Sequence, residues 1–181
     1  MSDRTTEIST AVQAAGAGIG DAAEQAERLL EAARGKSETA AQHGWGGVAG
    51  NLEQAVEQLE GAHGQLQTAE QLCESSTGVL NEINAQMSSP EVVEHLASAL
   101  SSLEEARTTT EAAQAQVDAA IGACEAAGQE SLPASLQELR DEVDEVRERI
   151  GKCRDDVAAE QDEAEQFAQE ADDREENPKQ K

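Results

Sequence analysis

Apolar residues recur at alternating intervals of four and three along the C-terminal third of the chain. The spacing is regular from Leu132 to Val157 and weakens over residues 160–171. This periodicity places the apolar side chains on one face of a helix and is typical of a coiled-coil seam sustained for more than three heptads. We therefore predict a long helix whose seam binds another helix. The predicted partner-binding residues are Leu136, Leu139, Val143, Val146, Ile150 and Val157.

A second predicted helix carries a heptad row of mostly large side chains between residues 45 and 87. A row of mostly small side chains flanks it, and small residues let a neighbouring helix approach closely at the cost of buried area. The large row consists of Trp45, Leu52, Leu59, Leu66, Cys73, Leu80 and Met87, and the small row of Ala55, Ala62, Ala69, Ser76 and Ile83.

A third helix is predicted to begin at Ser88-Ser89-Pro90-Glu91, where a serine N-cap precedes a proline at the first helical position. Two heptad rows are expected to face its neighbours. One contains Leu96, Leu103, Thr110, Val117 and Cys124, and the other contains Val93, Leu100, Arg107, Gln114 and Ile121. Because the middle of both rows is polar, these positions either specify the register of the helix or leave its seam partly open.

The N-terminal segment carries the weakest seam. The spacing is kept by Ile8, Val12, Ala15, Ile19, Ala22, Ala26, Leu29 and Ala33. Three glycines at positions 16, 18 and 20 interrupt it, and each internal glycine costs about 1 kcal/mol relative to alanine. We therefore expect this helix to fray or to depend on its neighbours.

Breaks between the four segments indicate how they connect. A glycine-rich loop is predicted over residues 35–50, and tight turns over residues 87–90 and 127–131. Short connections favour antiparallel neighbours, so the predicted fold is all-α: an elongated antiparallel coiled-coil bundle of three or four long helices. Residues 5–87 would form one helical hairpin and residues 88–171 a second. A disordered acidic tail is expected over residues 172–181.

Composition and charge restrict the partners of such a bundle. The chain has 38 acidic and 13 basic residues, a formal net charge of −25. Without a basic stripe it is not expected to bind nucleic acid, and an anionic membrane would repel it. Much of the 38% apolar fraction is alanine, so the bundle should be marginally stable alone. We expect a homo- or hetero-oligomer, in which the partner is another helical protein or a second copy.

The reactive side chains form no recognisable catalytic or metal-binding pattern. Cys73, Cys124 and Cys153 occupy seam positions, where a buried thiol is ordinarily structural, and the three histidines follow no zinc spacing. Nearly all carboxylates lie on predicted solvent faces, where little shifts a pKa toward a catalytic value. We therefore predict a non-enzymatic protein without a cofactor or a metal.

No targeting segment stands out in the sequence. The first residues lack a basic region followed by an apolar run, and the longest uncharged stretch near them is too short to span a bilayer. A cytoplasmic location is expected, unless the chain is secreted without a cleavable signal peptide by a route that uses folded helical signals.

A single tryptophan lies between the first two predicted helices, in His43-Gly44-Trp45-Gly46-Gly47. Over residues 5–87, the order helix, Trp45-Gly46-Gly47, helix resembles the small helical-hairpin proteins of ESX (type VII) secretion systems. The resemblance implies a hairpin that dimerises into a four-helix bundle, and it adds Trp45 and Gly47 to the predicted partner-binding residues. The chain has no tyrosine, so the tyrosine-containing secretion signal of that family is missing and export would use a partner's signal.

These patterns together predict a helical interaction protein that packs against its partner by coiled-coil contacts, as a type VII secretion-associated substrate or adaptor. The alternative is a structural coiled-coil protein of the cytoplasm that associates with itself.

Overall fold

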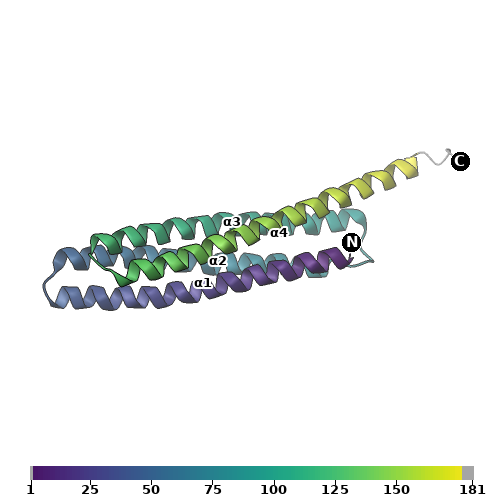
Figure 1. The fold of residues 1–181 in the computed structure, drawn as a ribbon. Coiled ribbons are helices and arrows are strands. Elements are labelled where there is room, and N and C mark those ends of the chain that lie inside the picture. Colours follow the sequence, from purple (N-terminus) through teal and green to yellow (C-terminus); the bar gives the residue numbers. More distant parts are fainter. Residues whose placement is uncertain (1, 177–181) are drawn as a thin grey trace.

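Four long helices account for nearly all of the structure, a computed structural model that describes the backbone of residues 2–176 and the side chains of residues 4–170. They are α1 (Ser2–Gln42), α2 (Gly46–Glu82), α3 (Ser89–Ala126) and α4 (Ser131–Glu176). Each helix runs antiparallel to the next (Figure 1), and the described part of the chain contains no strand. The predicted all-α antiparallel bundle is confirmed, with four helices.

The helices form a closed bundle around one core. α1 and α3 each pack on both α2 and α4, whereas no Cα atoms of helices at opposite corners come within 8 Å among the described residues. The contact between α1 and α4 is the smallest of the four. Because α2 packs along α3 about as extensively as along α1, the two predicted hairpins are halves of a single bundle.

The α1–α2 and α3–α4 turns lie at the same end of the bundle (Figure 1). Both turns are short, and each has a glycine two residues after its helix ends. The α1–α2 connection contains only residues 43–45. Gly44 adopts a φ of +75° and Gly128 a φ of +68°, a conformation that side chains disfavour. The amide of Trp45 donates to the carbonyl of Ala40 in α1, and an equivalent bond closes α3. The predicted loop over residues 35–50 is therefore wrong, since α1 continues as a helix to Gln42.

α3 begins where the sequence predicts. Ser88 is its N-cap and Pro90 lies in its first turn. The carboxylate of Glu91 accepts hydrogen bonds from both the backbone amide and the hydroxyl of Ser88, each at 2.7 Å. These bonds lower the pKa of Glu91. The turn before α3 is thus closed by contacts within four consecutive residues.

α2 and α3 both bury one row of large side chains and one row of small ones. In α2 the predicted rows are confirmed between Leu52 and Leu80, although Trp45 is exposed and Met87 only half-buried. In α3 the predicted second row is wrong. Its buried small residues are Ala99, Ala106, Ala113 and Ala120, whereas Val93, Leu100, Arg107, Gln114 and Ile121 lie half-buried at its edge.

The reason for this difference is the close approach of the helices. Alanines on facing helices bring the two backbones together, so the larger side chains are displaced to the flanks of the contact. Arg107 and Gln114 are consequently not buried register-setting groups. Thr110 is the polar residue that does enter the core of α3, and its hydroxyl is satisfied by the carbonyl of Ala106 at 2.7 Å.

α1 is continuous through its three glycines, so the expected fraying is not observed there. A Cβ atom on Gly16 would lie 3.2 Å from the Cβ of Cys73 in α2, and one on Gly18 would lie 3.0 Å from Cγ2 of Val146 in α4. These glycines therefore let α1 approach both neighbours. The seam follows the predicted positions except at Leu30, which is buried in place of Leu29.

α4 is the longest helix, with 46 residues, and its C-terminal end projects beyond the other three helices (Figure 1). Residues 172–176 of the predicted disordered tail are helical, while residues 177–181 lie outside the described residues. Among the described residues, no helix combines the length and the hydrophobicity needed to cross a bilayer.

Candidate interaction site

The α4 seam residues predicted to bind a partner are buried inside the chain's own bundle. None of the six, Leu136, Leu139, Val143, Val146, Ile150 and Val157, is more than 3% exposed. The periodic pattern identified a helix contact correctly, but the contact is intramolecular. A partner could reach this seam only if the bundle opened, so the prediction that these residues bind a partner is corrected.

Trp45 and Gly47 lie at the end of the bundle formed by the α1–α2 and α3–α4 turns. Trp45 is 58% exposed, and its ring packs against the imidazole of His43 with ring centroids 5.0 Å apart. A shallow groove beside it is lined by Lys36, Val48 and Gln129, which come from α1, α2 and the α3–α4 turn. The predicted aromatic contact point is thus on the surface, where a partner can reach it.

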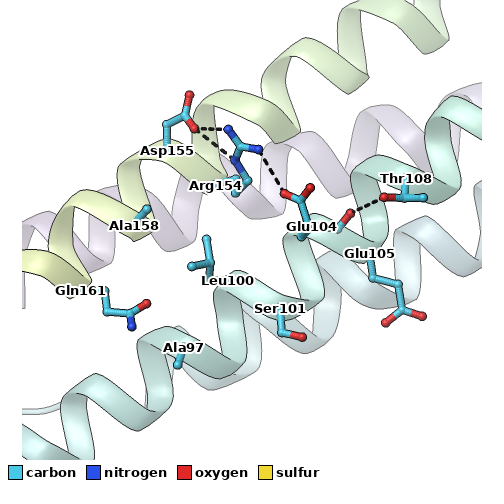
Figure 2. A pocket seen from close by; sticks show the side chains of 10 residues that line it. All are labelled: Ala97, Leu100, Ser101, Glu104, Glu105, Thr108, Arg154, Asp155, Ala158 and Gln161. Carbon is cyan, nitrogen blue, oxygen red and sulfur yellow. Dashed lines mark hydrogen bonds and ion pairs between the residues drawn. The ribbon is translucent and has the colours of Figure 1, made fainter.

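A second groove runs between α3 and α4, as Figure 2 shows. Ala97 and Leu100 form its α3 side, and Ala158 and Gln161 form its α4 side. The small side chain of Ala158 leaves Leu100 half-buried. Sequence reasoning missed this groove because it placed Leu100 in the seam. The sequence did contain a signal of this groove. A small residue such as Ala158 on one helix cannot fully cover a large residue such as Leu100 on the facing helix.

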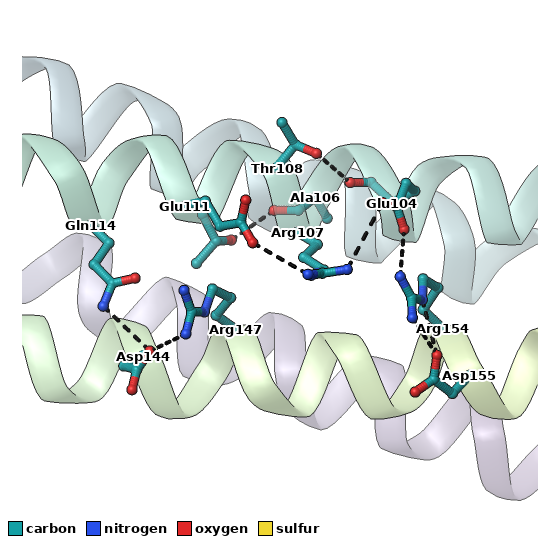
Figure 3. Close-up of polar contacts among 11 residues, drawn as sticks. Glu104, Ala106, Arg107, Thr108, Glu111, Gln114, Asp144, Arg147, Arg154 and Asp155 are labelled. Carbon is teal, nitrogen blue, oxygen red and sulfur yellow. Dashed lines mark hydrogen bonds and ion pairs between the residues drawn. The ribbon is translucent and has the colours of Figure 1, made fainter.

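Charged side chains close the groove and continue along the α3–α4 contact (Figure 3). Arg154 donates to Glu104 on α3 at 3.1 Å and to its neighbour Asp155. The hydrogen bonds that Arg154 donates to the carboxylates of Asp155 and Glu104 raise its pKa. Farther along, Asp144 accepts from Gln114 of α3 and from Arg147. Only the Arg154–Glu104 and Gln114–Asp144 contacts join α4 to α3 in this group, and such exposed or half-buried contacts contribute little stability.

The three cysteines are free and buried in the core. Burial raises the pKa of Cys73 to about 12 and also raises those of Cys124 and Cys153. The thiols therefore remain protonated at neutral pH. Cys73 and Cys153 lie on helices at opposite corners, whose Cα atoms stay more than 8 Å apart, too far for a disulfide without backbone movement. Within the described residues no cluster of His, Cys, Asp and Glu could hold a metal ion.

A carboxylate occupies the seam where the pattern weakens. Glu160 is 1% exposed, and its Oε2 lies 3.2 Å from Nε of Arg4 at the start of α1. Neither carboxylate oxygen accepts a hydrogen bond from a described residue. Arg4 also contacts Glu163, the next acidic residue on this side of α4, at 3.3 Å. An ionic cluster that sequence periodicity did not identify therefore joins the start of α1 to α4.

Beyond this cluster lies the α4 extension, which we define as residues 165–176. Phe167 is 51% exposed and, with Trp45, is one of two large apolar side chains exposed in the described part of the chain. It occupies the heptad position of Leu139, Val146, Cys153 and Glu160, all of which are buried against the bundle. The apolar row of α4 therefore continues to a side chain that the bundle leaves half uncovered.

Comparison of the chain with protein-family models, with curated proteins and with solved structures finds no match.

Proposed function

We propose that this protein is a non-enzymatic helical interaction protein that binds a helical partner by extending its own coiled-coil packing. The observation that carries this proposal is the half-exposed Phe167. The side chain continues a buried heptad row, so a partner helix could pack along α4 over Phe167. Contact at an end of the bundle requires no opening of the core.

The position of Trp45 supports the same proposal from the other end of the molecule. A tryptophan is an effective interface anchor because it buries a large area with little loss of conformational freedom. Here it projects from a three-residue turn between two long antiparallel helices. This arrangement is compatible with the resemblance to the Trp-x-Gly hairpins of type VII secretion systems, and we propose a role as a substrate or adaptor in that process.

Self-association as a structural coiled-coil protein is the competing proposal. The apolar face at Phe167 would also suit a second copy. Two α4 extensions, however, would bring their carboxylates together, and like charges on facing helices are destabilising. We therefore rank a different partner above a second copy, with the protein acting in the cytoplasm before any export.

Site-specific photo-cross-linking tests the proposed function. A benzophenone amino acid replaces Phe167, Trp45 or, as a control on an exposed side of α2, Glu57. After irradiation of producing cells, the tagged full chain is purified and its adducts are identified by mass spectrometry. We expect one dominant adduct with another helical protein from position 167 or 45 and none from position 57. Adducts with the same chain would favour self-association, and the absence of adducts at 167 and 45 would refute both proposals.

Export is tested separately. The culture supernatant is compared with the cell pellet by mass spectrometry, with a cytoplasmic protein as the lysis control. Enrichment of the chain in the supernatant over that control is expected. Its retention in the pellet would remove the secretion role and leave the interaction role in place.

A further inference from the structure

Lys36 is a half-buried cation without a counter-ion in a strongly acidic chain. All eight described arginines pair with a carboxylate. In the described part of the chain, no carboxylate oxygen lies within 4 Å of the ammonium of Lys36 or of Lys152. Lys152 is exposed, whereas Lys36 is half-buried. The ammonium of Lys36 has therefore lost part of its hydration without gaining a negative partner, which is unfavourable until an anion binds.

The groove beside Trp45 combines this cation with an apolar wall. Trp45, Val48 and Ala32 supply the apolar lining, and Trp45 is 58% exposed. Gly35 lines the groove without a side chain, and a Cβ atom added there would meet nothing within 4 Å. The volume of the groove is about 440 Å³, and small-molecule sites span about 300–1,000 Å³. An apolar body of small-molecule size can therefore lie against the indole.

The charges that line the groove favour an anion. Glu31 is the only carboxylate among the described lining residues, and its Oε1 already accepts from Arg34 at 2.6 Å. Lys36 is the only cation in the same lining and remains unpaired. Gln129, from the α3–α4 turn, adds a side-chain amide that can donate to an anion. The groove thus offers one free positive charge and a neutral donor beside an exposed aromatic ring.

We propose that this groove binds a small amphiphilic carboxylate, whose anionic group pairs with Lys36 and whose apolar body packs against Trp45. The lining along α1 extends only from Glu31 to Ala40, a rise of about 14 Å, which suits a short acid better than a long helix. The inference goes beyond the proposed function, because it concerns a small ligand rather than a helical partner.

The fluorescence of Trp45 reports directly on this site. The chain has one tryptophan and no tyrosine, so its intrinsic emission comes from the groove. The purified full-length chain is titrated with hexanoate, hexanol and hexylammonium, which share an alkyl chain and differ in charge. We expect a saturable change of emission with hexanoate and binding of hexanol weaker by at least about tenfold. The net charge of −25 opposes anions in general, so a preference for hexanoate over hexylammonium has to come from the groove.

Matched variants assign the binding to Lys36 and to the groove. Lys36→Gln should weaken hexanoate binding at least about tenfold, as expected for loss of a charge-assisted hydrogen bond, whereas Lys36→Arg should retain it. Lys152→Gln removes the other unpaired cation and should have no effect. Gly35→Met fills the groove and should weaken hexanoate and hexanol alike, while Gly64→Met, at an equally open glycine of α2, should weaken neither. Circular dichroism at 222 nm checks that each variant keeps its helices.

Three results would overturn the inference. These are equal affinities for hexanoate and hexanol, hexanoate binding that Lys36→Gln and Lys152→Gln affect equally, and a Trp45 response that Gly35→Met leaves intact. The outcome is separable from that of the cross-linking experiment. A partner adduct at position 45 without any response to hexanoate leaves the proposed function standing and removes only this ligand site. A response that requires Lys36, without adducts at positions 45 and 167, supports the ligand site and refutes the proposed function.

Discussion

A glycine-to-alanine substitution at two positions of α1 tests the packing of the bundle most directly. Gly16 and Gly35 lie in the interior of the same helix. A Cβ on Gly16 would meet the Cβ of Cys73 at 3.2 Å, whereas a Cβ on Gly35 would meet nothing within 4 Å. The identical substitution therefore adds a methyl group to a tight contact at one site and to open space at the other.

The expected difference follows from two opposing contributions. Alanine favours the helix over glycine by about 1 kcal/mol at either site. At Gly35 this gain is unopposed, so Gly35→Ala should raise the free energy of unfolding by about 1 kcal/mol. At Gly16 the Cβ of Cys73 cannot move without its backbone, and overpacking typically costs about 1–3 kcal/mol. Gly16→Ala should therefore be neutral or destabilising by up to about 2 kcal/mol.

Urea denaturation followed by circular dichroism at 222 nm measures both variants against the parent chain. The two should differ by about 1–3 kcal/mol, and a change of 1 kcal/mol shifts the thermal midpoint by about 2–4 °C in a chain of this size. If Gly16→Ala stabilised the protein as much as Gly35→Ala, α1 and α2 would not approach closely at Cys73, and the account of the glycines in α1 would be refuted.

Three further predictions concern buried and charged groups. The Cys73 thiol, with a pKa raised to about 12, should resist iodoacetamide at pH 8 until urea unfolds the chain. The stability linked to it should be present below pH 9 and fall as the pH rises toward 12, because the unfolded thiol ionises first; Cys73→Ala should remove this slope, and rapid native alkylation would contradict the burial. Glu160→Leu should maintain or raise the free energy of unfolding measured in urea, whereas Arg4→Ala should lower it by about 1–2 kcal/mol, since it leaves a buried carboxylate without its cation. A neutral Arg4→Ala would argue against that contact. Glu91→Ala should lower the thermal midpoint at pH 7, and the gap from the parent should close as the pH falls through the lowered pKa of Glu91; a gap that persists at low pH would count against the Ser88 contact.

Much of the fold follows from short-range patterns. The spacing of Leu136, Val143 and Ile150 specifies a helix with one apolar face whatever it packs against. Ser88 with Glu91 specifies a helix start, because the groups that satisfy the first amides are within one turn. These features were predictable because each depends on residues close together in the chain.

The candidate site depends on contacts that no local pattern contains. Periodicity did not reveal whether Leu100 or Ala99 enters the core of α3, because that choice depends on how closely the neighbouring helices approach. It also assigned the α4 seam to a partner, since a helix face has the same spacing whether its own chain or another covers it.

The sequence by itself determined four amphipathic helices, the capped start of α3 and the acidity of the C-terminal end of α4, because these depend on the identity and spacing of neighbouring residues. Only the tertiary structure decided that Glu160 is buried beside Arg4 of α1, that Trp45 is exposed at the opposite end and that Phe167 remains half-uncovered. The physical reason is register. Burial of a side chain depends on where the ends of distant helices meet, and that alignment is a property of the packed bundle.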